Sequence, residues 1–212
     1  MAHKSLGEKY LLGSGRVPKI VDHDERRLEL VDATWRIIAR LGIESATMRE
    51  IATEAGFANG ALKPYFPTKD TLLTFAFGHV FNRTNERIAE VTSGLSGLAA
   101  LRAFCVEVLP LDEERINEAR IVIPFWQKAI NDPGKAQIHR ESMQQWLDAI
   151  RRHLAEARDS GDVSTAVDDD SLAGQLLNML LGAQIAAALL PEGQTDLGLD
   201  RQLEGFLSLL TR

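Results

Sequence analysis

The chain has 212 residues, of which 45% are apolar and 25% charged, an ordinary composition for a globular protein with room for one large or two small domains. Its net charge of −6 is unevenly spread: residues 1–75 carry 11 Lys and Arg against 10 Asp and Glu, whereas residues 76–212 carry 13 against 20. The single cysteine, Cys105, excludes a disulfide framework within one chain, so we expect a buried thiol and a cytoplasmic protein.

Residues 1–20 are predicted to form a flexible basic arm. They carry four basic residues against one acidic residue, together with several glycines, and they lack the apolar stretch of a secretory signal. Arg16 and Lys19 could enter a DNA minor groove or contact phosphates. The alternative is a disordered tail that only improves solubility.

Two helical patterns follow the arm. The first covers about residues 22–41 with one apolar stripe and ends at Gly42. The second begins with Thr47-x-x-Glu50, a capping box, and ends at Gly56. A tight turn after a braced helix of this kind is typical of a helix-turn-helix unit.

A third, short helix is predicted over residues 59–65. The small Gly60 and Ala61 would let its backbone approach a DNA groove, while Leu62 packs back on the preceding helix. The guanidinium of Arg49 has the geometry that pairs with guanine. The Thr47 hydroxyl suits a phosphate. Lys63, Tyr65 and Lys69 are placed to reach base edges and phosphates around the groove.

The remaining chain is predicted to be helical as well, so the fold class is all-α. A long helix starts after Pro67, and further segments cover about 98–109, 112–131, 133–160, 168–190 and 196–211. Asp168, Asp169 and Asp170 lie at a helix start, where we interpret them as capping residues rather than a metal site.

The segment 168–190 is the most apolar part of the chain. Gln175, Asn178 and Gln184 interrupt it, so we prefer a buried helix to a membrane span. Apolar residues occupy two of its faces, and a second apolar stripe follows in the last helix. We therefore expect a homodimer formed through residues 168–211.

The stretch from about Asp24 to Phe77 resembles the amino-terminal domain of the TetR family of transcriptional regulators, through Gly42, the Thr47/Arg49/Ile51 series and Gly60-Ala61-Leu62. The resemblance implies a DNA-binding domain over 21–67 and a helical effector-binding and dimerisation domain over 68–212. It implies a homodimer on a near-palindromic operator that a small molecule releases. The implied base contacts are Arg49, Asn59, Gly60, Ala61 and Lys63. The implied phosphate contacts are Thr47, Tyr65 and Lys69.

The body from Leu109 onward resembles the BetI-like branch of that family's ligand-binding domains. Its effector is not identified by the sequence, although the resemblance hints at a cation such as choline. Aromatic and polar residues of the middle helices are equally compatible with a pocket and with plain core. The candidate pocket residues are Phe104, Arg120, Trp126, Gln127, Trp146 and Asn178.

Three positions depart from the family pattern: Ala58 lacks a capping side chain, Lys63 replaces a common aromatic, and Pro64 lacks a backbone N–H. They keep open an alternative, a helical small-molecule-binding or adaptor protein that has lost operator binding. The sequence does not distinguish a repressor from an activator. It contains no motif of a catalytic, metal or cofactor site, so we expect neither an enzyme nor a cofactor.

Overall fold

The computed structural model describes residues 23–41, 46–58, 60–191 and 197–211. The basic arm and Asn59 lie outside these ranges, so the expectations placed on them are not addressed by the structure. The described residues form eight α-helices and no strand, which confirms the all-α prediction. Their bounds are α1 His23–Leu41, α2 Met48–Glu54, α3 Lys69–Val91, α4 Gly97–Val108, α5 Glu113–Ala129, α6 Pro133–Asp159, α7 Asp169–Ala188 and α8 Leu199–Leu210.

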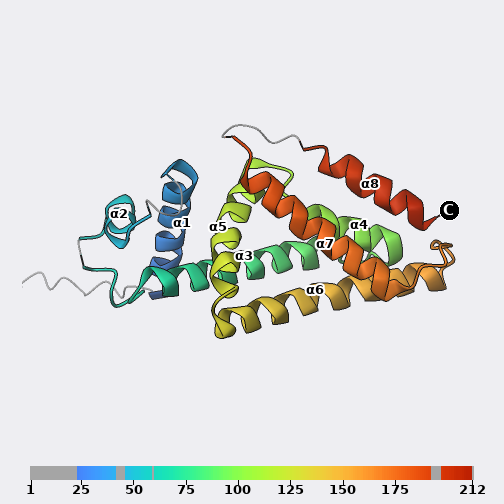
Figure 1. Ribbon diagram of the computed structural model, residues 1–212, viewed down its shortest axis with the longest axis horizontal. Coiled ribbons are helices and arrows are strands. Elements are labelled where there is room, and N and C mark those ends of the chain that lie inside the picture. Colours follow the sequence, from blue (N-terminus) through green and yellow to red (C-terminus); the bar gives the residue numbers. More distant parts are fainter. Residues whose placement is uncertain (1–22, 42–45, 59, 192–196, 212) are drawn as a thin grey trace, which may run out of the picture.

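The molecule has a small head and a larger body, joined by α3 (Figure 1). The head consists of α1, α2, the turns over residues 60–66 and the first turns of α3, while α4 to α8 and the rest of α3 form the body. Each part has its own apolar core. Residues from α5, including Phe125, belong to the core of the head, so α5 braces the head against the body.

Short polar side chains fix where the helices begin. The Thr47 hydroxyl accepts a hydrogen bond from the Glu50 amide at 3.2 Å, and the Glu50 carboxylate accepts one from the Thr47 amide at 2.9 Å. The expected capping box of α2 is therefore present. Asp168 accepts from the Ser171 amide at 2.8 Å and caps α7, as expected for this acidic cluster.

Helix α7 is apolar over most of its circumference. Its length and composition alone would allow a membrane span, and 39% of its most apolar window is buried inside the structure, which is weak evidence for such a span. Leu176 and Leu180 are fully buried against the body core, whereas Ile185 and Leu189 are exposed. One face of α7 therefore packs inside the body and another lies open.

Candidate functional site

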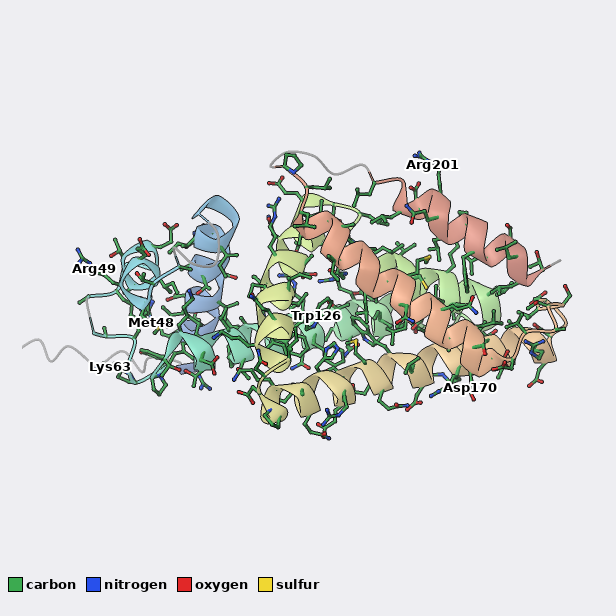
Figure 2. The ribbon with its side chains drawn as sticks, in the orientation of Figure 1. Met48, Arg49, Lys63, Trp126, Asp170 and Arg201 are labelled. Atoms are coloured by element: carbon green, nitrogen blue, oxygen red, sulfur yellow. The ribbon has the colours of Figure 1, made fainter. Side chains whose placement is uncertain are left out.

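The outer end of the head carries an exposed arginine whose side chain is unpaired within the described residues and is free to bind a partner molecule. Arg49 lies in the first turn of α2 and is exposed (Figure 2). An intrahelical salt bridge with Glu50 or Glu54 would be a purely structural role for this side chain. Glu50 instead closes the capping box on Thr47, and Glu54 pairs with Arg36 at 2.8 Å. Within the described part of the chain the Arg49 guanidinium has no hydrogen-bond or ion-pair partner.

The predicted third helix is wrong as an α-helix. Residues 60–65 form consecutive turns, with i to i+3 hydrogen bonds such as Ala61 N to Ala58 O at 3.0 Å and Tyr65 N to Leu62 O at 2.9 Å. The reasons are local. Gly60 has a φ of +87°, outside the right-handed helical region, and Pro64 lacks an amide hydrogen and disfavours helical geometry in the residue before it.

The turns nevertheless present the expected side chains. Leu62 is buried at 3% exposure and anchors the segment in the head core, as predicted. Lys63 points outward from the same end of the head as Arg49 and is exposed (Figure 2). Tyr65 is half-buried, with its ring 5.9 Å from that of Phe57 in an edge-to-face arrangement. Lys69 follows, half-exposed, in the first turn of α3.

A groove runs between α2 and the turns. It is lined by Met48, Arg49, Gly60, Leu62, Lys63 and Pro67. Two cations at the edge of an apolar groove suit a duplex, because guanidinium and ammonium groups pair with base edges and phosphates while a methionine fits a thymine methyl. Sequence reasoning missed Met48. Its only signal was its place between Thr47 and Arg49 at the start of α2.

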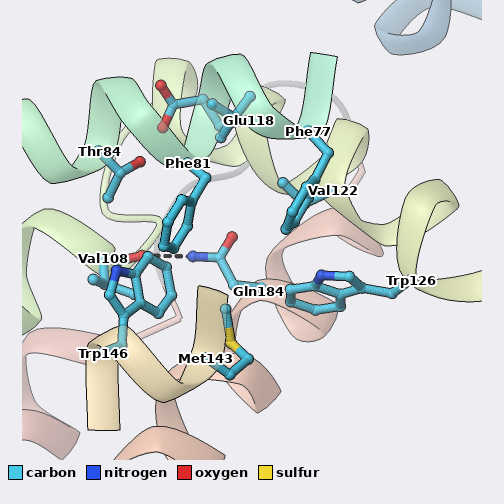
Figure 3. Close-up of a pocket in the computed structure, with 11 residues that line it drawn as sticks. Phe77, Phe81, Thr84, Val108, Glu118, Val122, Trp126, Met143, Trp146 and Gln184 are labelled. Carbon is cyan, nitrogen blue, oxygen red and sulfur yellow. Dashed lines mark hydrogen bonds between the residues drawn. The ribbon is translucent and has the colours of Figure 1, made fainter. Parts of the chain in front are cut away.

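The body holds a cavity between five helices, called the body cavity below (Figure 3). Its wall consists of Phe77, Val80, Phe81 and Thr84 from α3, Val108 from α4, Glu118, Val122 and Trp126 from α5, Met143 and Trp146 from α6, and Gln184 from α7. The space inside it that is open to a water-sized molecule is about 30 Å³, so a larger molecule must push the wall side chains apart to enter. The wall is mostly apolar with a few polar groups, the usual character of a small-ligand site.

The six candidate pocket residues are only partly brought together. Trp126 and Trp146 line the body cavity, and Phe104 is buried behind Trp146 with the two rings 6.2 Å apart. Arg120 lies outside the cavity wall and donates to the Leu190 carbonyl at 3.1 Å. Gln127 and Asn178 do not face inward as expected, because both are exposed on outer helix faces. For Asn178 the reason is that α7 is apolar on nearly all sides, so its rotation could not be read from its pattern.

Buried charges lie beside the body cavity. Arg87 donates to both oxygens of Glu118, at 3.0 and 2.9 Å, and to Glu107 at 3.1 Å. Arg115 donates to the same Glu107 at 2.6 Å. Although burial acts in the opposite direction, these carboxylates hold the pKa values of both arginines above their ordinary range. Glu107 and Glu118 are therefore both paired with partly buried arginines, of which Arg115 also pairs with Asp112.

The body cavity shares its wall with the core of the head. Phe77, Val80 and Val122 belong to both. The Phe77 ring also stacks on Phe125, with centroids 4.0 Å apart and planes inclined by 10°. A molecule that pushes these side chains apart would disturb the packing that positions α1 and the start of α3.

Ion pairs between α3 and the α5–α6 region stabilise the contact between the head and the body. Asp70, in the first turn of α3, lies 2.7 Å from Lys135 Nζ and 3.2 Å from Lys128 Nζ. The hydrogen bond from Lys135 is the largest cause that lowers the pKa of Asp70, with Lys128 contributing in the same direction. A carboxyl whose pKa is lower in the folded state adds stability above its unfolded pKa of about 4, and this stability disappears as the pH falls.

We therefore expect Asp70→Asn to lower the free energy of unfolding at pH 7. Asp70 is 42% exposed, so the loss is roughly 0.5–1 kcal/mol after screening by solvent. The difference from the wild type should shrink as the pH falls below about 4. Denaturant unfolding at pH 7 and pH 3 measures it, with Asp159→Asn as control because Asp159 is exposed and unpaired within the described residues. An equal difference at both pH values contradicts the expectation.

Fold and site together define a helix-turn-helix DNA-binding protein with a helical regulatory body. Residues 30–74 match the profile of bacterial regulatory proteins of the tetR family, and residues 98–210 match that of the BetI-type transcriptional repressor C-terminal domain. The chain belongs to the TetR family of transcriptional regulators, which confirms the resemblance seen in the sequence.

Individual relatives agree. The chain is 32% identical over 176 residues to the HTH-type transcriptional regulator PksA of Bacillus subtilis, covering 82% of this chain and 84% of that protein. It is 28% identical over 120 residues to BetI of Serratia proteamaculans, covering 55% and 61%.

Two solved structures share the fold. A transcriptional regulator from Rhodococcus sp. Rha1 matches with a TM-score of 0.73 at 27% identity, over 87% of this chain and 95% of that one. A putative transcriptional regulator from Saccharomonospora viridis, solved in complex with choline, matches with a TM-score of 0.78 at 21% identity, over 87% and 96%.

Proposed function

We propose that the protein is a homodimeric repressor that leaves a near-palindromic operator when a small molecule occupies the body cavity. The observation that carries the proposal is Arg49, which is exposed beside the groove of the head, has no partner among the described residues, and lies on a helix whose start is fixed by a capping box. Because the body cavity and the head core share part of their walls, a molecule bound in the cavity would change the packing of the head. The protein would act in the cytoplasm, where its DNA is.

The positions of the side chains in the head support a proposed set of DNA contacts. Arg49 and Lys63 flank the groove and are assigned to base edges or adjoining phosphates. The Thr47 side chain, together with Tyr65 and Lys69, lies around them and is assigned to the backbone. Gly60 and Ala61, in the turns, and Asn59, which lies outside the described residues, complete the proposed contact set.

A shift assay with the protein's own upstream region tests the proposal. We expect a specific complex whose affinity falls steeply between 50 and 200 mM salt, since each phosphate contact releases a counterion. An unrelated fragment of equal length is the control. The competing reading, an adaptor without operator binding, is favoured by the irregular 60–65 turns and predicts no complex at any salt concentration.

The proposed dimer face is the open side of α7 together with α8. Ile185, Leu189 and Leu209 are 48%, 79% and 58% exposed. A TetR-family regulator usually acts as a dimer, and a large exposed apolar face on the two C-terminal helices is suited to an isologous interface.

We expect Ile185→Glu combined with Leu189→Glu to give a monomer at micromolar concentration and to abolish stable operator binding. Two charges on each copy would face one another across the interface without partners. Sedimentation and the shift assay measure the two effects. Gln145→Glu, an exposed position on α6, is the control and should stay dimeric. A double variant that remains dimeric and DNA-bound places the interface elsewhere.

A further inference from the structure

The ionisable group on the wall of the body cavity is already paired. Among the described residues that line the body cavity, Glu118 is the one with an ionisable side chain. Both of its carboxylate oxygens accept hydrogen bonds from Arg87, at 3.0 and 2.9 Å. A cationic ligand would have to compete with this two-bond pair and would face the Arg87 guanidinium behind it. An anionic ligand would face the Glu118 carboxylate without a free cation on the wall.

The wall does hold an unsatisfied neutral donor. The Trp126 indole Nε1 is buried and has no hydrogen-bond partner in the described structure. The other polar groups differ: the Trp146 indole donates to Asn85 at 2.9 Å, and the Gln184 amide donates to the Val108 carbonyl (Figure 3). A buried N–H without an acceptor is costly, so a ligand oxygen that displaces the side chains covering Trp126 Nε1 and accepts from it would relieve the cost.

The aromatic neighbour of Trp126 is neutral as well. The His139 ring lies edge-to-face against Trp126 with centroids 5.6 Å apart, and its Nδ1 is likewise buried without a partner. Burial lowers the pKa of His139, which keeps the imidazole neutral near pH 7. The same cavity wall also contains Phe77, Phe81 and Met143.

We propose that the effector is an uncharged, mainly apolar small molecule carrying an oxygen that accepts a hydrogen bond from Trp126 Nε1. The inference rests on the proposed function, since it names the chemical class of the molecule that the body cavity binds. It separates this protein from a regulator that binds a quaternary ammonium ion, because the carboxylates that would add to the attraction of the aromatic rings for such a cation are not free. Here those charges are already balanced by Arg87 and Arg115.

Matched probes of equal shape and different charge test the proposal. Choline is compared with 3,3-dimethylbutan-1-ol, in which carbon replaces the cationic nitrogen. Benzylammonium and benzoate are compared with benzyl alcohol. Calorimetry on the full-length protein is expected to show each alcohol binding at least about tenfold more tightly than its charged counterparts, since the charged forms lose hydration without gaining a partner. Equal or tighter binding of either cation overturns the proposal, as does absence of binding by both alcohols.

A second measurement isolates the indole donor. Trp126→Phe keeps an aromatic ring and removes the N–H, so its affinity for benzyl alcohol should fall by roughly tenfold while its affinity for toluene, which has no oxygen, stays unchanged. An unchanged affinity for benzyl alcohol removes Trp126 from the proposal. The shift assay is read separately. If only a charged compound releases the operator complex, the proposed uncharged effector is wrong but the proposed repressor function stands. If no operator complex forms, the proposed repressor function itself is wrong.

Discussion

Replacing Arg49 by alanine is expected to weaken operator binding on the order of a hundredfold. A bidentate contact from arginine to guanine contributes roughly 1–3 kcal/mol of discrimination, and a dimer presents the residue at two half-sites. Arg49 is exposed and has no partner among the described residues, so its loss removes no contact that the folded protein needs. Thermal stability should therefore be unchanged while affinity in the shift assay collapses.

The matched control for Arg49 is Arg102→Ala. Arg102 is a surface arginine of α4, paired with Glu204 at 2.6 Å in the body and remote from the head. It removes the same charge from the chain, so it corrects for any general effect of net charge on DNA affinity. Equal losses for the two variants would mean that Arg49 acts through bulk charge alone. A lower melting temperature for Arg49→Ala would assign it a structural role.

Phe125→Ala is expected to destabilise the protein by about 3–5 kcal/mol. Phe125 is fully buried, stacks on Phe77 at 4.0 Å, and lies where α5 joins the head. The truncation leaves a cavity where the cores of the head and the body meet, and the surrounding side chains fill it only in part. It also removes the aromatic pair, which by itself accounts for about 0.5–1.5 kcal/mol beyond the burial of area.

Two variants make the Phe125 measurement specific. Phe125→Leu keeps much of the apolar volume and should cost clearly less. Ile130→Ala, at an 80% exposed position just beyond α5, should stay within about 0.5 kcal/mol of the wild type. All variants are unfolded by denaturant at one protein concentration, because the proposed dimerisation would make apparent stability depend on that concentration. A loss below 1 kcal/mol for Phe125→Ala would show that α5 does not brace the head.

Local signals predicted the helices well. Capping residues such as Thr47 and Asp168 mark the starts of α2 and α7, as the sequence predicted. These signals act through hydrogen bonds between residues three or four apart, so they can be recognised from the sequence alone. The burial of Leu62 and Cys105 was legible too, because each lies in a short apolar pattern.

The residues that line the body cavity were much harder to predict from the sequence. Gln127 and Asn178 are polar residues on largely apolar helices, and nothing in their spacing told that they lie on outer faces. Glu118 was missed because its partner Arg87 is 31 residues away. Residues 60–65 form turns instead of the predicted helix because Gly60 has a positive φ and Pro64 lacks an amide hydrogen.

The sequence alone determined the helical class, the helix starts and the family of the head, since capping, periodicity and the motif from Thr47 to Lys69 depend on near neighbours. Only the tertiary structure decided which charges are paired, which indole N–H is left without an acceptor, and that one wall serves both the body cavity and the head. These properties depend on side chains from α3, α5 and α6 that meet across long stretches of chain, and no local pattern records such meetings.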